Sequence, residues 1–323
     1  MNDYIGIVFL NMGGPDSLAT VRPFLYNLFS DREIIQLGPR FLQPFIAWAI
    51  SMWRAPKSRA AYAKIGGMSP LAETTRAQAK AVEQLLNNKL QEKVFCLAGM
   101  RYWDPRTPDI LHNMKDRGIS KVLALSLYPH YSRATSGSSI GEFKRCAEKL
   151  GLETHVIDSF PDYPGYVAAL ADIVQEGLEK VKDKKNSALV YSAHSLPKSM
   201  VEEGDPYVEH LYRTITALEE LTGIKGHLCY QSRSGPVEWL EPGTDVLLNE
   251  LAEKGFHSLL VLPISFVSDH VETLYEIDLL YAEMMAEKGV KLVRTPSLND
   301  RPLFINALSN LVEQGLKKAG WLE

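Results

Sequence analysis

Eight apolar, β-branched runs separated by helical patterns constrain the fold of this 323-residue chain more than any other feature. The runs lie at about residues 4–10, 93–99, 120–128, 153–158, 187–193, 226–230, 257–264 and 290–293. The segments between them have helical periodicity, as at Thr74–Lys89, Ser138–Leu150, Val208–Leu221 and Thr244–Lys254. Strands that alternate with helices predict an α/β protein whose parallel sheets carry helices on both faces.

The eight runs fall into two groups of four, and the third run of each group ends alike, as Leu123–Pro129 and Leu259–Pro263. We therefore predict two Rossmann-like, doubly wound domains, each with a four-stranded parallel sheet flanked by helices. The N-terminal domain is expected over residues 1–161 and the C-terminal domain over 162–301. A final helix in 302–323 is expected to pack back on the first half, and the ligand cleft is expected between the domains.

Composition excludes several classes of function. Hydrophobic residues at 46% and charged residues at 23% are typical of a soluble globular protein. The 35 basic residues are balanced by 39 acidic ones, which argues against a nucleic-acid partner. No G-x-S-x-G, Walker A or H-E-x-x-H motif supports a hydrolase or nucleotidase. Three scattered cysteines and an N-terminus that opens into a strand indicate a cytoplasmic protein.

One stretch departs from the alternation of strands and helices. Phe41–Trp53 is apolar almost throughout and begins after Arg40. It is shorter than the roughly 20 residues that a membrane-spanning helix needs. It is therefore either a helix of the core or a lip, over about residues 40–57, that dips into a membrane interface. Because Pro44 and Pro56 are expected to interrupt it, we favour the lip.

His194 ends the apolar run at 187–193 and is followed by Ser195-Leu196-Pro197. The residue before a proline avoids the α region, so a turn is expected here rather than a helix. A turn presents the imidazole at the carboxyl edge of a parallel sheet, where ligands bind in such folds. The alternative is a histidine that is only hydrogen-bonded within the structure.

Four polar residues follow the run at 257–264: Asp269, His270, Glu272 and Glu276. Asp269 and Glu272 have the spacing of a helix capping box, and Glu276 lies one turn beyond Glu272. The acids are therefore either a helix start with a solvated stripe, or a cleft-facing set that carries protons or cations. The spacing alone leaves both open.

Six motifs in order resemble one known family over nearly the whole chain. They are Leu10–Pro15; Tyr62 with Ile65–Pro70; Tyr128–Ser132; Ser192–Pro197 with Gly204–Tyr207; Gln231-Ser232 with Trp239-Leu240; and Phe266–Asp278. Together they resemble ferrochelatase, the enzyme that inserts Fe(II) into a porphyrin at the end of haem synthesis. The resemblance implies two Rossmann-like domains around the porphyrin, with residues 40–57 as the lip of the site.

The resemblance also implies roles for individual residues. His194 matches the catalytic histidine of the family, and Glu272 matches its partner carboxylate. The metal substrate is expected to meet His194, Glu272, Glu276 and Asp269. The positions that line the pocket or hold the macrocycle are Met12, Arg54, Tyr62, Ser69, Arg101, Tyr128, Trp239, Phe266 and His270.

The apolar lip and Met12 favour protoporphyrin IX as the substrate, with coproporphyrin III as the alternative. Two rival functions are a cobalt or nickel chelatase that acts on another tetrapyrrole, and a non-catalytic tetrapyrrole or haem carrier. No iron–sulfur cluster is expected, because the chain ends without the cysteine cluster of the animal enzymes and has Arg133 at the first-domain cysteine position. Peripheral membrane contact through the lip is also expected.

Overall fold

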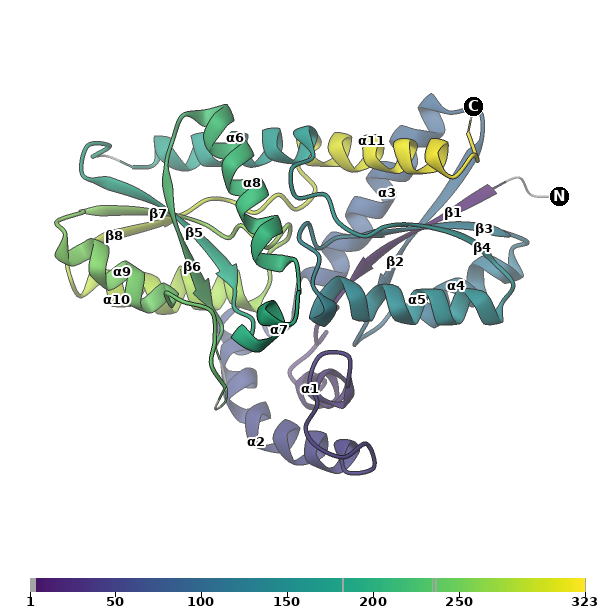
Figure 1. Cartoon of the computed structure of the whole chain (residues 1–323), viewed down its shortest axis with the longest axis horizontal. Coiled ribbons are helices and arrows are strands. Elements are labelled where there is room, and N and C mark those ends of the chain that lie inside the picture. Colours follow the sequence, from purple (N-terminus) through teal and green to yellow (C-terminus); the bar gives the residue numbers. More distant parts are fainter. Residues whose placement is uncertain (1–3, 182, 234, 236, 323) are drawn as a thin grey trace. The chain divides into compact units, whose positions relative to one another are not determined.

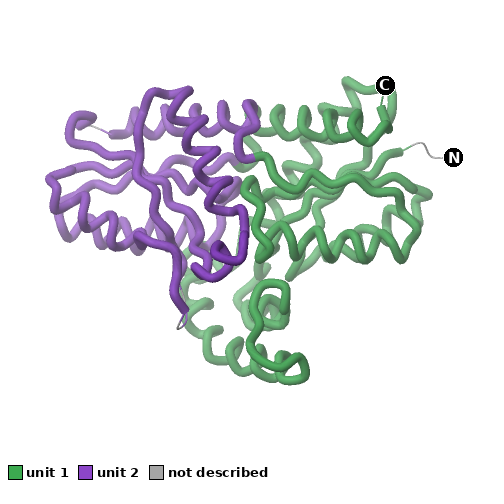
Figure 2. Tube along the Cα trace, viewed as in Figure 1, with its two compact units in different colours: residues 1–160, 299–323 green, residues 161–298 purple. Residues whose placement is uncertain are grey.

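The computed structural model describes residues 4–181, 183–233, 235 and 237–322. The chain forms two compact units, which Figure 2 shows in different colours. The first consists of Met1–Phe160 with Asn299–Glu323, and the second of Pro161–Leu298.

The first unit contains a parallel sheet in the order β2-β1-β3-β4. Its strands are β1 (Tyr4–Asn11), β2 (Lys93–Met100), β3 (Lys121–Ser126) and β4 (Glu153–Ile157). The central strand β1 is buried on both faces, as expected for a parallel strand covered by helices on either side. The predicted α/β class is confirmed here.

Helices cover both faces of this sheet (Figure 1). The helical elements of the first unit are α1 (Val21–Ser30), α2 (Gln43–Lys64), α3 (Leu71–Lys89), α4 (Thr107–Asp116), a π-helical segment η1 (Arg133–Gly137), α5 (Ser138–Lys149) and α11 (Pro302–Lys318). α4 and α5 pack on one face, where Met114 and Phe143 are fully buried against Val8 and Val122. α3 and α11 pack together on the other face.

The second unit repeats this strand order as β6-β5-β7-β8, again all parallel. Its elements are α6 (Pro164–Glu179), β5 (Ser187–His194), α7 (Lys198–Glu202), α8 (Tyr207–Thr222), β6 (Gly226–Gln231), α9 (Thr244–Glu253), β7 (Ser258–Leu262), a π-helical segment η2 (Glu272–Tyr281), α10 (Ala282–Ala286) and β8 (Lys291–Arg294). α9 and α10 cover one face of the sheet, and α6 and α8 cover the other (Figure 1). Two Rossmann-like sheets are therefore present, as predicted.

Parallel pairing places the ends of all four strands of the second sheet at one edge. β5 ends at His194, β6 at Gln231 and β8 at Arg294, while β7 leads into the segment that precedes η2. This edge is where open α/β sheets bind their ligands.

Most of the lip segment, residues 43–57, forms the first part of α2. Pro44 lies in the first turn and Pro56 lies inside the helix, so the predicted interruption by prolines is wrong. The core alternative is not favoured either, because the buried side chains of α2 are mainly small while Phe45 and Trp53 are 68% and 80% exposed. No helix in the described ranges is long and apolar enough to cross a membrane.

A substitution at Gly226 would test how tightly the second sheet is packed. A Cβ atom at this position would lie 2.6 Å from the ring of Tyr191, which is fully buried. We expect Gly226→Ala to lower the free energy of unfolding by about 1–3 kcal/mol, because the ring has no room to move. Urea unfolding measures this loss.

The matched control is Gly141→Ala in α5, where the added Cβ would meet only the mobile ends of Arg145 and Glu33. Alanine favours a helix by about 1 kcal/mol over glycine, so this variant should be neutral or more stable. Equal losses in the two variants would contradict the packing argument.

Candidate active site

A histidine–carboxylate pair lies at the carboxyl edge of the second sheet. His194 Nδ1 is 2.7 Å from Glu272 Oε2. The backbone N–H of His194 donates to Ser265 Oγ at 2.9 Å, and the Tyr207 hydroxyl donates to the His194 carbonyl at 2.9 Å. The residue is thus held from both sides, and its side chain remains 36% exposed. The helical segment η2 begins at Glu272 with Val271 rather than Asp269 as its N-cap residue, so the predicted capping box does not start this helix.

Ser232 connects the two glutamates of η2. Its hydroxyl lies 2.7 Å from one oxygen of Glu272 and 2.7 Å from one oxygen of Glu276. Gln231 adds a hydrogen bond from Nε2 to the backbone carbonyl of Glu272 at 3.1 Å. Because a hydroxyl carries one hydrogen, Ser232 can bond both acids fully only when one of them is protonated. His194, Glu272, Ser232 and Glu276 therefore form one hydrogen-bonded chain.

Burial and neighbouring charges separate the pKa values of the two glutamates. Burial alone would raise the pKa of Glu272, but the charge and hydrogen bond of His194 outweigh it and lower the pKa to about 2. Burial and the charge of Glu272 raise the pKa of Glu276 to about 7. Although burial opposes it, Glu272 also raises the pKa of His194. The arrangement therefore favours a charged Glu272 and a Glu276 that exchanges a proton near neutral pH.

His270 and Phe266 lie beside this chain. The Phe266 ring makes edge contacts with His270 at 4.2 Å and with His194 at 6.3 Å between centroids. Both ring nitrogens of His270 are buried and have no hydrogen-bond partner among the described residues. Burial lowers its pKa, so the imidazole is neutral at physiological pH.

Asp269 is held differently from the two glutamates. Its Oδ1 accepts from Ser297 Oγ at 2.7 Å and from Arg294 Nη1 at 3.0 Å. Within the described ranges, no group of three or more His, Cys, Asp or Glu side chains is arranged to hold a metal ion. The predicted set of four metal-contacting residues is therefore not assembled as one cluster, and its role stays a prediction.

Three predicted ring-contacting residues, Met12, Tyr62 and Ser69, lie in the first unit. Met12 directly follows β1 and is half-buried, whereas Tyr62 near the end of α2 is buried. Ser69 is also buried, and its Oγ accepts the N–H of Leu71 at 3.3 Å. A Cβ on Gly14 would lie 2.5 Å from Ser69, so glycine permits this close approach.

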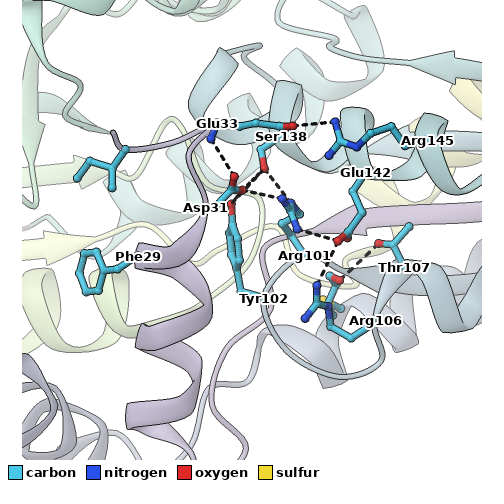
Figure 3. Close-up of polar contacts among 12 residues, drawn as sticks. Phe29, Asp31, Glu33, Arg101, Tyr102, Arg106, Thr107, Ser138, Glu142 and Arg145 are labelled. Carbon is cyan, nitrogen blue, oxygen red and sulfur yellow. Dashed lines mark hydrogen bonds and ion pairs between the residues drawn. The ribbon is translucent and has the colours of Figure 1, made fainter. Parts of the chain in front are cut away.

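Arg101 belongs to a buried ionic cluster that Figure 3 shows. Its guanidinium bonds Asp31 Oδ2 at 2.8 Å and Glu142 Oε1 at 2.7 Å, and its Nε bonds Ser138 Oγ at 2.8 Å. The Tyr102 hydroxyl donates to the same Asp31 oxygen at 2.7 Å. The side chain is thus bound within the protein, and a contact with the macrocycle stays a prediction.

The remaining predicted positions are Arg54, Tyr128 and Trp239. The Arg54 guanidinium lies 5.7 Å above the Phe29 ring. Tyr128 follows β3 and is half-buried, and burial raises the pKa of its phenol. Trp239 forms a β-bridge with Pro197, close in sequence to His194.

Sequence reasoning did not assign roles to Ser232, Gln231 or Arg294. Each lies at or just after the end of a strand, which is the same signal that pointed to His194. Ser232 also has a positive φ of 63°, which no residue pattern revealed.

Comparison with known proteins decides the family. The family model described as ferrochelatase matches residues 4–316. The ferrochelatase of Geotalea uraniireducens (strain Rf4) is 51% identical over 318 residues, which cover 97% of this chain and 98% of that protein. The ferrochelatase of Desulfotalea psychrophila is 50% identical over 309 residues, covering 95% and 96%.

The chain belongs to the ferrochelatase family. It is therefore an enzyme of haem biosynthesis that inserts a metal ion into a porphyrin, with Fe(II) as a substrate, and not a non-catalytic carrier.

Solved structures support the fold alone. The sirohydrochlorin chelatase SirB from Bacillus subtilis subspecies spizizenii, in complex with cobalt, superposes with a TM-score of 0.53 at 13% identity. That match covers 76% of this chain and 90% of SirB. DR2241 from Deinococcus radiodurans has a TM-score of 0.54 at 14% identity, over 97% of this chain and 55% of that protein.

The raised pKa of Glu276 predicts a pH-dependent stability. The pKa of Glu276 is about 7 in the folded protein and near 4.5 in the unfolded chain. The stability that the protonated side chain contributes is therefore fully present below pH 4.5 and is lost as the pH rises through 7. Glu276→Gln removes this loss. The variant should gain on the order of 1–3 kcal/mol relative to wild type between pH 5 and pH 8.

Urea unfolding of both proteins at the two pH values measures this difference. A difference in unfolding free energy that does not change with pH would show that Glu276 titrates normally in the folded enzyme.

Proposed function

We propose that this enzyme inserts Fe(II) into protoporphyrin IX, with His194 as the base that accepts a pyrrole proton. The observation that carries the proposal is the 2.7 Å pair between His194 Nδ1 and Glu272. When Nδ1–H donates to the carboxylate, the lone pair of the neutral imidazole lies on Nε2. The partly exposed Nε2 is then the atom that takes the proton.

Metal insertion requires the macrocycle to lose two pyrrole protons while the metal ion loses its water shell. A positioned base lowers the barrier to proton loss, and Glu272 stabilises the imidazolium that forms. Ser232 and Glu276 extend the hydrogen-bonded chain away from His194, so a proton can pass from His194 towards Glu276. The charge of Glu272 also favours the approach of a divalent cation.

The porphyrin contacts are proposed from the family resemblance and from side-chain type. Aromatic and thioether groups suit the faces of a planar macrocycle, and Arg54 or Ser69 suits a propionate. His270 and Phe266 lie beside His194 and complete an apolar surface around the base. Met12 and the exposed apolar residues of the lip favour vinyl groups over the additional propionates of coproporphyrin III.

The substrate proposal predicts the outcome of anaerobic Fe(II) insertion followed by absorbance. Protoporphyrin IX should be turned over faster than coproporphyrin III, and Fe(II) should be used in preference to Co(II) or Ni(II). Preference for coproporphyrin III would overturn the choice of substrate, and preference for Co(II) or Ni(II) would favour the rival chelatase.

The proposed base is tested by His194→Ala. Metal insertion should fall by roughly 10²–10⁴-fold while porphyrin binding, measured by fluorescence quenching, stays within a few-fold of wild type. The matched control is His227→Ala on β6, an exposed histidine in the same unit, which should retain full activity. Lost porphyrin binding with residual turnover by His194→Ala would contradict the assignment.

We further propose that the enzyme is cytoplasmic and meets a membrane surface through the lip. Phe45, Trp48 and Met52 are exposed at spacings of three and four residues, which places them on one side of α2, and Trp53 adjoins them. Phe41, just before the helix, is also exposed. Arg40 and Lys57 flank the segment. An apolar face edged by basic residues and tryptophans suits an interfacial helix.

Replacing Phe45 and Trp53 together by serine should reduce binding to anionic phospholipid vesicles at least tenfold in a flotation assay, because two exposed aromatic side chains no longer enter the interface. Leu221→Ser is the control, since Leu221 is 58% exposed on α8 outside the lip. Wild-type flotation by the double variant, or no vesicle binding by the wild type, would refute a membrane role for the lip.

A further inference from the structure

Arg294 occupies an unusual place for a charged residue. It is the last residue of β8, at the carboxyl edge of the second sheet, and its side chain is only 11% exposed. Its Nε and Nη2 bond the two carboxylate oxygens of Asp278 at 2.7 and 2.8 Å. Its Nη1 bonds Asp269 Oδ1 at 3.0 Å. One guanidinium therefore joins two carboxylates that are nine positions apart in sequence.

The two aspartates bracket the acidic residues of the site. Asp269 precedes Glu272 by three positions, and Asp278 follows Glu276 by two. Ser297 and Thr273 also donate to Asp269, at 2.7 and 3.1 Å. Both ends of the segment that carries the glutamates are thus tied to a residue of the sheet.

The segment between the two aspartates has an uncommon winding. η2 is π-helical over ten residues, whereas π-helices usually occur as a single turn. A π-helix has more residues per turn than an α-helix, so rewinding Glu272–Asp278 as an α-helix would rotate Asp278 by roughly 100° relative to Glu272. With Glu272 bound to His194, the bond between Arg294 and Asp278 is compatible with one winding only.

We infer that Arg294 is a positioning residue that holds η2 in its π-helical winding and so keeps Glu272 and Glu276 on His194 and Ser232. The inference rests on the proposed function of the two glutamates, through which Arg294 acts. Arginine suits this task because its planar fork bonds one carboxylate with two parallel hydrogen bonds and still reaches a second. A lysine keeps the charge but cannot make this set of contacts.

Arg294→Lys keeps the positive charge but removes the forked pair of hydrogen bonds to Asp278. We expect kcat to fall roughly 10–100-fold, the range found when outer partners of a reactive group are removed, with KM for the porphyrin within threefold of wild type. Amide hydrogen exchange should become at least tenfold faster in Glu272–Tyr281 and remain unchanged in α9. Wild-type kcat and exchange in this variant would overturn the inference.

Arg213 provides a matched control. It makes a forked ion pair with Asp162 in the same unit, with Nε and Nη2 at 2.8–3.1 Å from the carboxylate, but far from the glutamates in sequence and more exposed. Arg213→Lys should change neither kcat nor exchange in η2. If it reproduces the effects of Arg294→Lys, the loss of any such pair is sufficient and the inference fails.

A double-mutant cycle with the combined variant Glu272→Gln/Glu276→Gln distinguishes positioning from general stabilisation. If Arg294 acts through the two glutamates, Arg294→Lys should cost no more than about threefold in kcat once both are replaced. Multiplicative losses would contradict the inference. Asp278→Asn releases the same contact from the helix and replaces Arg294→Lys in the cycle if the lysine variant folds poorly.

Failure of the proposed function has a separate signature. Wild-type rates of metal insertion by the His194→Ala and Glu272→Gln variants would contradict the proposed chemistry. Loss of activity in those variants together with wild-type kcat and exchange in Arg294→Lys would remove only the role of Arg294.

Discussion

Parallel pairing of β5 with β6 and β7 is the constraint on which the site depends. Because parallel strands all end at the same edge, His194, Gln231 and the segment before η2 meet there without any special loop. The strands are buried on both faces, so their register is fixed by the core rather than by the polar groups. The position of the base is thus a consequence of the hydrophobic packing of the sheet.

Buried acids are costly unless they are paired, and the site meets this cost with three kinds of partner. Glu272 is paired with His194, and Glu276 shares the Ser232 hydroxyl with Glu272. Asp278 is bound by the guanidinium of Arg294. The different partners of Glu272 and Glu276 lower the pKa of the first carboxyl and raise the pKa of the second. A chain of groups with graded pKa values is suited to moving protons in one direction.

Much of the fold and part of the site could be predicted from the sequence, because both follow from local patterns. Apolar runs and turn signals indicated the strands, and His194 and Glu272 were found because each follows a strand. The continuity of α2 through Pro56 was not predicted, since a proline inside a helix removes a backbone hydrogen bond and usually ends or kinks the helix. The winding of η2, the positive φ of Ser232 and the pairings of Asp31 and Arg294 depend on distant residues, so no local pattern could reveal them.

The two units share more than their strand order. Each has a π-helical segment after its third strand, η1 after β3 and η2 after β7. π-helical turns occur frequently at functional sites, and here they occupy the same topological position in both units. The first copy contains serine, threonine and arginine where the second carries carboxylates. The π-helical winding therefore occurs in this chain both with acidic side chains and without them, so the winding itself does not depend on the carboxylates that η2 carries.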